Sequence, residues 1–215
     1  MLSELQQRLS ETYQLDHSHD VQDYVITDPG LAKLIGQDAL LAGSDETLFI
    51  AEDEDGLALS LFLDSEMLDR LNVADPLNEL KPGCLDDLWK VLEGISHFSC
   101  VAFKAGQDRK LSLLELELQG EVDKFVSSMR LALEQSETDL PKHLHSWLFD
   151  NVRFHDELDA QALDRYRAAN DYAARFCHHL QSSLLDSDEQ AMAELRQFYR
   201  LPISDKISYI HSQAW

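Results

Sequence analysis

Two apolar, β-rich runs in the first third of the chain predict a small sheet. They cover residues 47–51 (TLFIA) and 57–63 (LALSLFL), and an acidic segment ending in Asp55 and Gly56 separates them. An Asp-Gly pair between apolar runs is a strong short-range signal for a hairpin. We therefore expect an antiparallel hairpin near residues 47–63.

The two segments before this hairpin differ in periodicity. Residues 3–12 carry Leu5 and Leu9 at helical spacing, which predicts a short amphipathic helix. Residues 23–27 (DYVIT) are rich in β-forming side chains and end at an Asp-Pro-Gly sequence, which stops a strand. The expected order is therefore helix, loop, strand and hairpin.

Helical spacing replaces alternation after the prolines and glycine of residues 76–83. Apolar residues three and four apart predict a helix from about residue 85 to at least residue 97. The clearest stripe consists of Leu111, Leu114, Leu118, Val122, Phe125, Met129 and Ala132. It predicts a long helix with one buried face. Gly120 inside the stripe and alternating leucines over residues 110–119 leave a strand there as an open alternative.

A second stripe predicts another packed helix and consists of Leu163, Tyr166, Asn170, Ala173, Cys177, Leu180 and Leu184. Ser187 or Asp188 is expected to cap the next helix, and a last short helix is expected over about residues 204–210. The chain is therefore expected to end in helices.

These patterns together predict an α+β protein with a small antiparallel β portion in its N-terminal part and a bundle-like helical C-terminal part. We expect an acidic α/β portion over residues 1–82 and a mainly helical portion over residues 83–215. The two portions are expected to pack together as one compact unit.

Composition indicates a globular, cytoplasmic protein. Hydrophobic residues make up 44% of the chain, which is enough for a buried core. Charged or hydroxyl side chains interrupt every apolar run long before the roughly 20 residues of a membrane span, and the N-terminal residues lack the pattern of a secretory signal. Cys84, Cys100 and Cys177 show no CxxC spacing, which is typical of buried thiols in a reducing compartment.

The strong negative charge of the chain disfavours some classes of binding partner and favours others. The chain has 40 acidic and 18 basic residues, a net charge of −22. Residues 1–100 hold 21 acidic and 5 basic residues, whereas residues 101–215 hold 19 and 13. Such a surface repels phosphate backbones and anionic membranes, so we expect neither direct nucleic-acid binding nor membrane binding. A basic protein surface, self-association or simple maintenance of solubility, as in a saline habitat, remain as interpretations.

Two pairs of residues four apart suggest metal ligands. Glu93 and His97 lie on one face of a predicted helix, and Glu117 and Glu121 have the same spacing on the long helix. If the two helices pack as a hairpin, three carboxylates and an imidazole meet and can hold a divalent metal ion. The competing interpretation is a partly buried His97 and exposed carboxylates balanced by Lys124.

Other candidate ligands are weaker. His17 and His19 lie between Asp16 and Asp20 in the sequence. Histidines two apart in a loop have no fixed geometry, however, and are typical of a solvated turn. The sequence has no glycine-rich phosphate loop, no GxSxG elbow and no dinucleotide fingerprint. These absences disfavour the common nucleotide-dependent enzymes and serine hydrolases.

Residues 153–176 include a cluster of arginines and aromatic residues in an otherwise acidic chain, and this cluster indicates a docking face. Arginine and aromatic residues together are typical of protein interfaces. The candidate partner-binding residues are Arg153, Arg165, Tyr166, Arg167, Tyr172 and Arg175, interleaved with Phe154 and Phe176. A polar helix face with ordinary core aromatics is the competing interpretation.

Two functions are compatible with this sequence. The first is an acidic binding or regulatory protein that acts through protein–protein contacts with a basic surface. The alternative is a small metal-dependent enzyme, hydrolase-like, in which Glu93, His97, Glu117 and Glu121 serve as ligands or as general acid and base.

Overall fold

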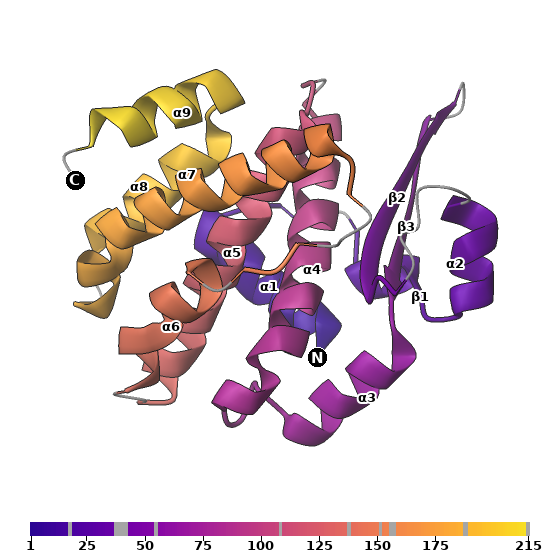
Figure 1. Ribbon diagram of the computed structural model, residues 1–215, viewed down its shortest axis with the longest axis horizontal. Coiled ribbons are helices and arrows are strands. Elements are labelled where there is room, and N and C mark those ends of the chain that lie inside the picture. Colours follow the sequence, from indigo (N-terminus) through magenta and orange to yellow (C-terminus); the bar gives the residue numbers. More distant parts are fainter. Residues whose placement is uncertain are drawn as a thin grey trace. The chain divides into compact units, whose positions relative to one another are not determined.

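The computed structural model describes residues 1–16, 19–36, 43–53, 56–107, 109–136, 139–150, 152–154, 158–186 and 189–213. Its fold is α+β, as predicted, with a small mixed sheet in the N-terminal part and helices in the C-terminal part (Figure 1). The chain forms two compact units. Unit 1 comprises Met1–Gln7 and Asp16–Lys110, and unit 2 comprises Arg8–Leu15 and Leu111–Trp215.

The predicted hairpin is the main part of the sheet. Strands β2 (Glu46–Asp53) and β3 (Gly56–Leu63) pair antiparallel, and β1 (Val25–Ile26) pairs parallel with β3 in the order β1-β3-β2. The strand expected over residues 23–27 is reduced to β1. Residues Val21–Tyr24 instead form a 3-10 helix, η1, because the carboxylate of Asp20 caps it by accepting a hydrogen bond from the Gln22 N–H.

Alternation along the hairpin directs side chains to two opposite faces. Phe49 and Phe62 form a small core with Ala32 of helix α2 (Pro29–Gly36). Leu61 points the other way, toward Gly94 of helix α4 (Leu85–Ala105). Accordingly α2 and α4 lie on opposite sides of the hairpin in Figure 1.

Capping carboxylates begin two helices of unit 1 that periodicity did not predict. Asp28 accepts hydrogen bonds from the N–H groups of Gly30 and Leu31, so the Asp-Pro-Gly sequence ends β1 and also begins α2. Asp64 accepts from the Met67 N–H and begins α3 (Ser65–Ala74). Both helices are short, so apolar spacing alone gives little signal for them.

The predicted helix over residues 85–97 is α4, which extends to Ala105. A short 3-10 helix, η3 (Pro82–Cys84), leads into it. The predicted boundary between residues 82 and 83 therefore falls inside unit 1, within η3. The packing of both portions as one compact unit stays a prediction.

Unit 2 is helical in the residues that the structure describes. Its elements are α5 (Leu113–Glu134), α6 (Leu140–Phe149), α7 (Ala160–Leu185), α8 (Glu189–Arg200), α9 (Ile203–Ser212) and the C-terminal part of α1 (Leu2–Tyr13). Helices α5 and α7 pack along each other. The strand alternative over residues 110–119 is wrong, because Ser112 caps α5 and Leu113 onward is helical. The predicted caps Ser187 and Asp188 lie outside the described residues.

The central and C-terminal parts of both predicted apolar stripes form core, whereas Leu111 precedes α5 and Leu114, Leu163, Tyr166 and Asn170 are only partly buried. Leu118, Val122, Phe125, Met129 and Ala132 of α5 and Ala173, Cys177, Leu180 and Leu184 of α7 are buried. Among the described residues, no helix combines the length and the apolar character needed to cross a membrane.

Candidate metal centre

The predicted pair Glu93 and His97 meets a third potential ligand in unit 1. Both residues lie on α4, and Glu46 at the start of β2 joins them. One donor atom from each side chain can be chosen so that all three lie within 4.8 Å of one another. Among the residues that the structure describes, these three form the one group of at least three His, Cys, Asp or Glu side chains close enough to share a metal ion.

Partial burial makes the charge of this group important. The side chains of His97 and Glu46 are only 9% and 14% exposed, and Nδ1 of His97 lies 3.9 Å from Oε1 of Glu46. Glu93 is half-buried. Two carboxylates this close repel each other, and loss of water strengthens the repulsion. A cation, either a protonated His97 or a bound metal ion, stabilises the arrangement.

Gly94 makes room for the Glu46 carboxylate on α4. A Cβ at residue 94 would lie 3.0 Å from Cγ and 3.1 Å from Oε1 of Glu46, and 2.8 Å from Cδ1 of Leu61. Glycine inside a helix costs about 1 kcal/mol relative to alanine. The lack of a side chain at residue 94 therefore lets the strand carboxylate approach between the two helix ligands.

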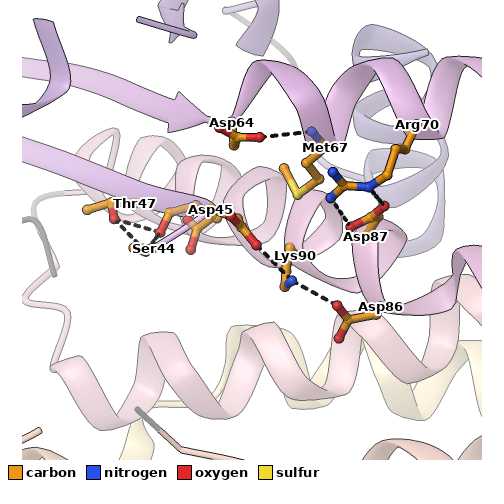
Figure 2. Close-up of polar contacts among 10 residues, drawn as sticks. Ser44, Asp45, Thr47, Asp64, Met67, Arg70, Asp86, Asp87 and Lys90 are labelled. Atoms are coloured by element: carbon orange, nitrogen blue, oxygen red, sulfur yellow. Dashed lines mark hydrogen bonds and ion pairs between the residues drawn. The ribbon is translucent and has the colours of Figure 1, made fainter. Parts of the chain in front are cut away.

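Lys90 ties the residue next to Glu46 to the same helix. Its Nζ lies 2.8 Å from Oδ2 of Asp45 and 2.8 Å from Oδ2 of Asp86, and Figure 2 shows the ammonium group between the two carboxylates. Burial lowers the pKa of Lys90, but its hydrogen bonds to Asp45 and Asp86 outweigh this effect and raise the pKa above its ordinary value. Lys90 therefore stays charged and holds the start of β2 on α4.

The backbone of this segment is held as well. The hydroxyls of Ser44 and Thr47 both donate to the carbonyl oxygen of Glu46, each at 2.6 Å. The N–H of Asp64 donates to the carbonyl oxygen of Asp45 at 2.8 Å. These bonds restrict the peptide units on both sides of the Glu46 side chain.

A second ion pair, three residues before Lys90 along α4, joins this helix to α3. Arg70 of α3 donates two hydrogen bonds of 2.8 Å to the carboxylate of Asp87 (Figure 2). Hydrogen bonding to Arg70 is the main cause that lowers the pKa of Asp87. This pair resembles the Lys90 pair in chemistry but contacts no candidate ligand.

The other predicted pair, Glu117 and Glu121, belongs to unit 2, and each carboxylate has a basic neighbour there. Oε1 of Glu117 lies 3.8 Å from Nε of Arg165, and Oε1 of Glu121 lies 2.7 Å from Nζ of Lys124. The ion pair with Lys124 is therefore present, and Arg165 provides a second one, but the expectation that both carboxylates are exposed is wrong, because the side chains of Glu117 and Glu121 are 8% and 15% exposed. A single site formed by Glu93, His97, Glu117 and Glu121 stays a prediction.

The arginine-aromatic patch is partly engaged within unit 2. Arg165 also lies over the ring of Tyr166, at 5.3 Å from its centroid, and Arg175 pairs with Asp171 on the next turn of α7. Tyr172 packs edge-on against His211. Arg153 and Arg167 are exposed. A partner-binding role for Arg153, Arg165, Tyr166, Arg167, Tyr172 and Arg175 stays a prediction.

Neither His19 nor His145 contributes to the three-residue group. His17 lies outside the described residues, and Nδ1 of His19 is hydrogen-bonded to the Tyr24 hydroxyl at 2.9 Å. In unit 2, His145 bonds the Ala174 carbonyl through Nε2 at 2.8 Å.

Sequence reasoning missed a buried polar network in unit 2. The hydroxyl of Tyr13 donates to Oδ1 of Asp123 at 2.5 Å, and Gln119 donates to the same oxygen at 2.8 Å. Lys206 of α9 donates to Oε1 of Gln119 at 2.7 Å and lies over the ring of Phe198. Tyr13, Gln119, Asp123 and Lys206 are at most 1% exposed. The network therefore joins α1, α5 and α9 and is closed to a substrate.

Comparison with known proteins gives no relative for the chain. It matches no protein-family model, no curated protein and no solved structure.

Proposed function

We propose that unit 1 binds one divalent metal ion through Glu46, Glu93 and His97. The observation that supports this is the approach of three donor side chains, from a strand and a helix, to within 4.8 Å of one another. Two carboxylates and one imidazole suit borderline and hard ions such as Zn²⁺, Mn²⁺ and Fe²⁺. The negative charge of the largely buried Glu46 carboxylate, beside the half-buried Glu93, further favours a cation.

Three protein ligands favour a catalytic over a structural role for the metal. Structural zinc sites are usually closed by four protein ligands, whereas catalytic sites keep a position for water or substrate. A metal ion lowers the pKa of a water in that position and so provides a nucleophile near neutral pH. The proposed activity is therefore that of a small metal-dependent hydrolase.

Metal titration of the chelator-treated protein tests the proposal. Calorimetry with Zn²⁺ and Mn²⁺ is expected to show one site per chain, and Glu46→Gln and His97→Ala are each expected to weaken binding at least about tenfold. Glu52→Gln is the matched control, because Glu52 lies on the same strand but is exposed. Absence of a stoichiometric site, or an equal effect of the control, would contradict the proposal.

The same titration separates the three-residue site from the four-residue prediction. Glu117→Gln and Glu121→Gln remove carboxylates that have Arg165 and Lys124 as neighbours. We expect both variants to bind metal like the parent protein. A loss of affinity in either variant would instead support a site that includes residues of α5.

An acidic binding surface on unit 1 is the second candidate function. Unit 1 holds 21 acidic and 7 basic residues, a net charge of −14. Three of its basic residues, Arg70, Lys81 and Lys90, lie in ion pairs with carboxylates of the same unit. This imbalance supports a basic protein surface, or self-association, as the partner and disfavours nucleic acid.

Salt-dependent capture tests this second candidate. A partner held by charge is expected to dissociate at high salt and to bind less well after Glu66→Gln and Asp69→Asn, which neutralise exposed carboxylates of α3. Asp164→Asn and Asp171→Asn on α7 are the matched controls. Partner binding that changes neither with salt nor with the α3 substitutions would contradict a charge-based surface. The buried thiols of Cys84, Cys100 and Cys177 support the cytoplasm as the compartment.

A further inference from the structure

Asp45 and Glu46 are consecutive residues that contact successive turns of α4. The carboxylate of Asp45 pairs with Lys90, and the Glu46 side chain lies against Gly94, four residues further along the helix. Fixing Asp45 therefore fixes the Cα from which the Glu46 side chain projects. The start of β2 is held at two points along the same face of the helix.

We propose that the Lys90–Asp45 ion pair is a positioning device that holds Glu46 in place for metal binding; this inference rests on the proposed metal site. The hydroxyls of Ser44 and Thr47 restrain the Glu46 carbonyl at the same time. With the backbone restrained on both sides, only the side-chain torsions of Glu46 remain to be ordered when a metal binds. A ligand that is ordered in advance loses less conformational entropy on binding, and affinity increases.

Lys90 is not a proposed ligand, and its charge and its positioning of Glu46 have opposite effects on metal affinity. A positive charge one residue from a ligand repels a metal cation, so the loss of charge alone strengthens metal binding. The loss of positioning weakens it. The sign of the change in dissociation constant on Lys90→Met therefore distinguishes the two effects.

Arg70→Met is the matched control. The Arg70–Asp87 pair also joins α4 to a neighbouring segment of unit 1, and its two bonds have the same 2.8 Å length as those of Lys90. It lies next to no candidate ligand. Loss of stability common to both variants is therefore separated from loss of positioning.

Metal titration and amide exchange of the four proteins test the inference. The Zn²⁺ or Mn²⁺ dissociation constant is expected to rise about threefold to tenfold in Lys90→Met, to change less than about twofold in Arg70→Met, and to recover in Lys90→Arg. In the metal-free protein, amide hydrogen exchange over residues 44–47 is expected to accelerate in Lys90→Met only. Should Lys90→Met fold poorly, Asp45→Asn removes the same pair, and amide exchange over residues 44–47 is then the readout, because loss of the Asp45 charge weakens metal binding by itself.

The outcomes separate this inference from the proposed function. If the parent protein binds no metal, both the metal site and the positioning role are contradicted. A parent protein that binds metal, together with an unchanged or lower dissociation constant in Lys90→Met, overturns the positioning role alone. Unchanged exchange over residues 44–47 overturns it as well, because the segment is then held without the ion pair.

Discussion

Replacing Tyr13 with Phe removes one hydroxyl from the interior of unit 2 and leaves the aromatic ring unchanged. The ring stacks on Tyr199 at a centroid distance of 4.3 Å, and a phenyl ring preserves this contact. The hydroxyl donates to Asp123, which is 1% exposed. The substitution therefore takes one donor from a buried carboxylate that has no access to water as a replacement.

The expected loss follows from the charge and burial of the acceptor. A hydrogen bond to a charged group contributes about 1.5–3 kcal/mol. Gln119 still donates to Asp123 in the variant, and Lys206 still balances its charge through Gln119. We therefore expect Tyr13→Phe to lower the free energy of unfolding by about 2 kcal/mol.

Tyr209→Phe provides a matched control in the same unit. The hydroxyl of Tyr209 also donates to a carboxylate, that of Glu194, at 2.7 Å. The side chain of Glu194 is 20% exposed, so water can replace the lost donor. We expect a loss of less than about 1 kcal/mol in this variant. Urea unfolding followed by circular dichroism, at equal m-values, measures both losses. Similar losses in the two variants would refute the reasoning.

The same hydroxyl predicts a dependence on alkaline pH. Burial, and then the charge and hydrogen bond of Asp123, raise the pKa of Tyr13 well above its ordinary value of 10.0. A pKa that is higher in the folded than in the unfolded chain contributes stability that is complete below pH 10.0 and is lost as the pH rises above it. Tyr13→Phe should therefore lose less stability than the parent protein above this pH. An identical alkaline decline in both proteins would assign it to other groups.

Two further predictions concern unit 1. Gly94→Ala is expected to weaken metal binding and to destabilise the unit, because the new Cβ would lie 3.1 Å from Oε1 of Glu46 and 2.8 Å from Cδ1 of Leu61. Metal titration and thermal unfolding measure the two effects, and an unchanged metal affinity would contradict the prediction. Arg70 lowers the pKa of Asp87, so the pair contributes stability above pH 3.8 that is lost as the pH falls. Because the Arg70 side chain is 54% exposed and solvent screens the pair, we expect Arg70→Met to change stability little near neutral pH and to reduce the acid dependence of unfolding.

Local patterns predicted the larger elements because each is determined by neighbours in the sequence. The hairpin followed from Asp55 and Gly56 between apolar runs, and α5 and α7 followed from stripes that are long enough for a regular period. Helices α2 and α3 were missed because they are short and depend on the capping carboxylates of Asp28 and Asp64. The strand near Tyr24 was predicted too long for the same reason, since a cap at Asp20 favours a 3-10 helix.

The candidate site was predicted in part. The spacing of Glu93 and His97 placed both side chains on one helix face, because a helix brings residues four apart together wherever it forms. Glu46 is 47 residues away in sequence from Glu93, and no local period connects them. A faint signal existed in Gly94, since a glycine beside candidate ligands in a helix indicates close approach of another segment.

Periodicity and charge along the chain were enough to predict the α+β class, the acidity, the hairpin, the long helices and one pair of candidate ligands, because both are properties of residues close together in the sequence. Which distant groups meet depended on the packing of the folded chain. It brought Glu46 over Gly94, gave Arg165 to Glu117 and buried Tyr13 against Asp123. Such contacts depend on how elements pack, and packing joins residues whose separation along the chain carries no periodic signal.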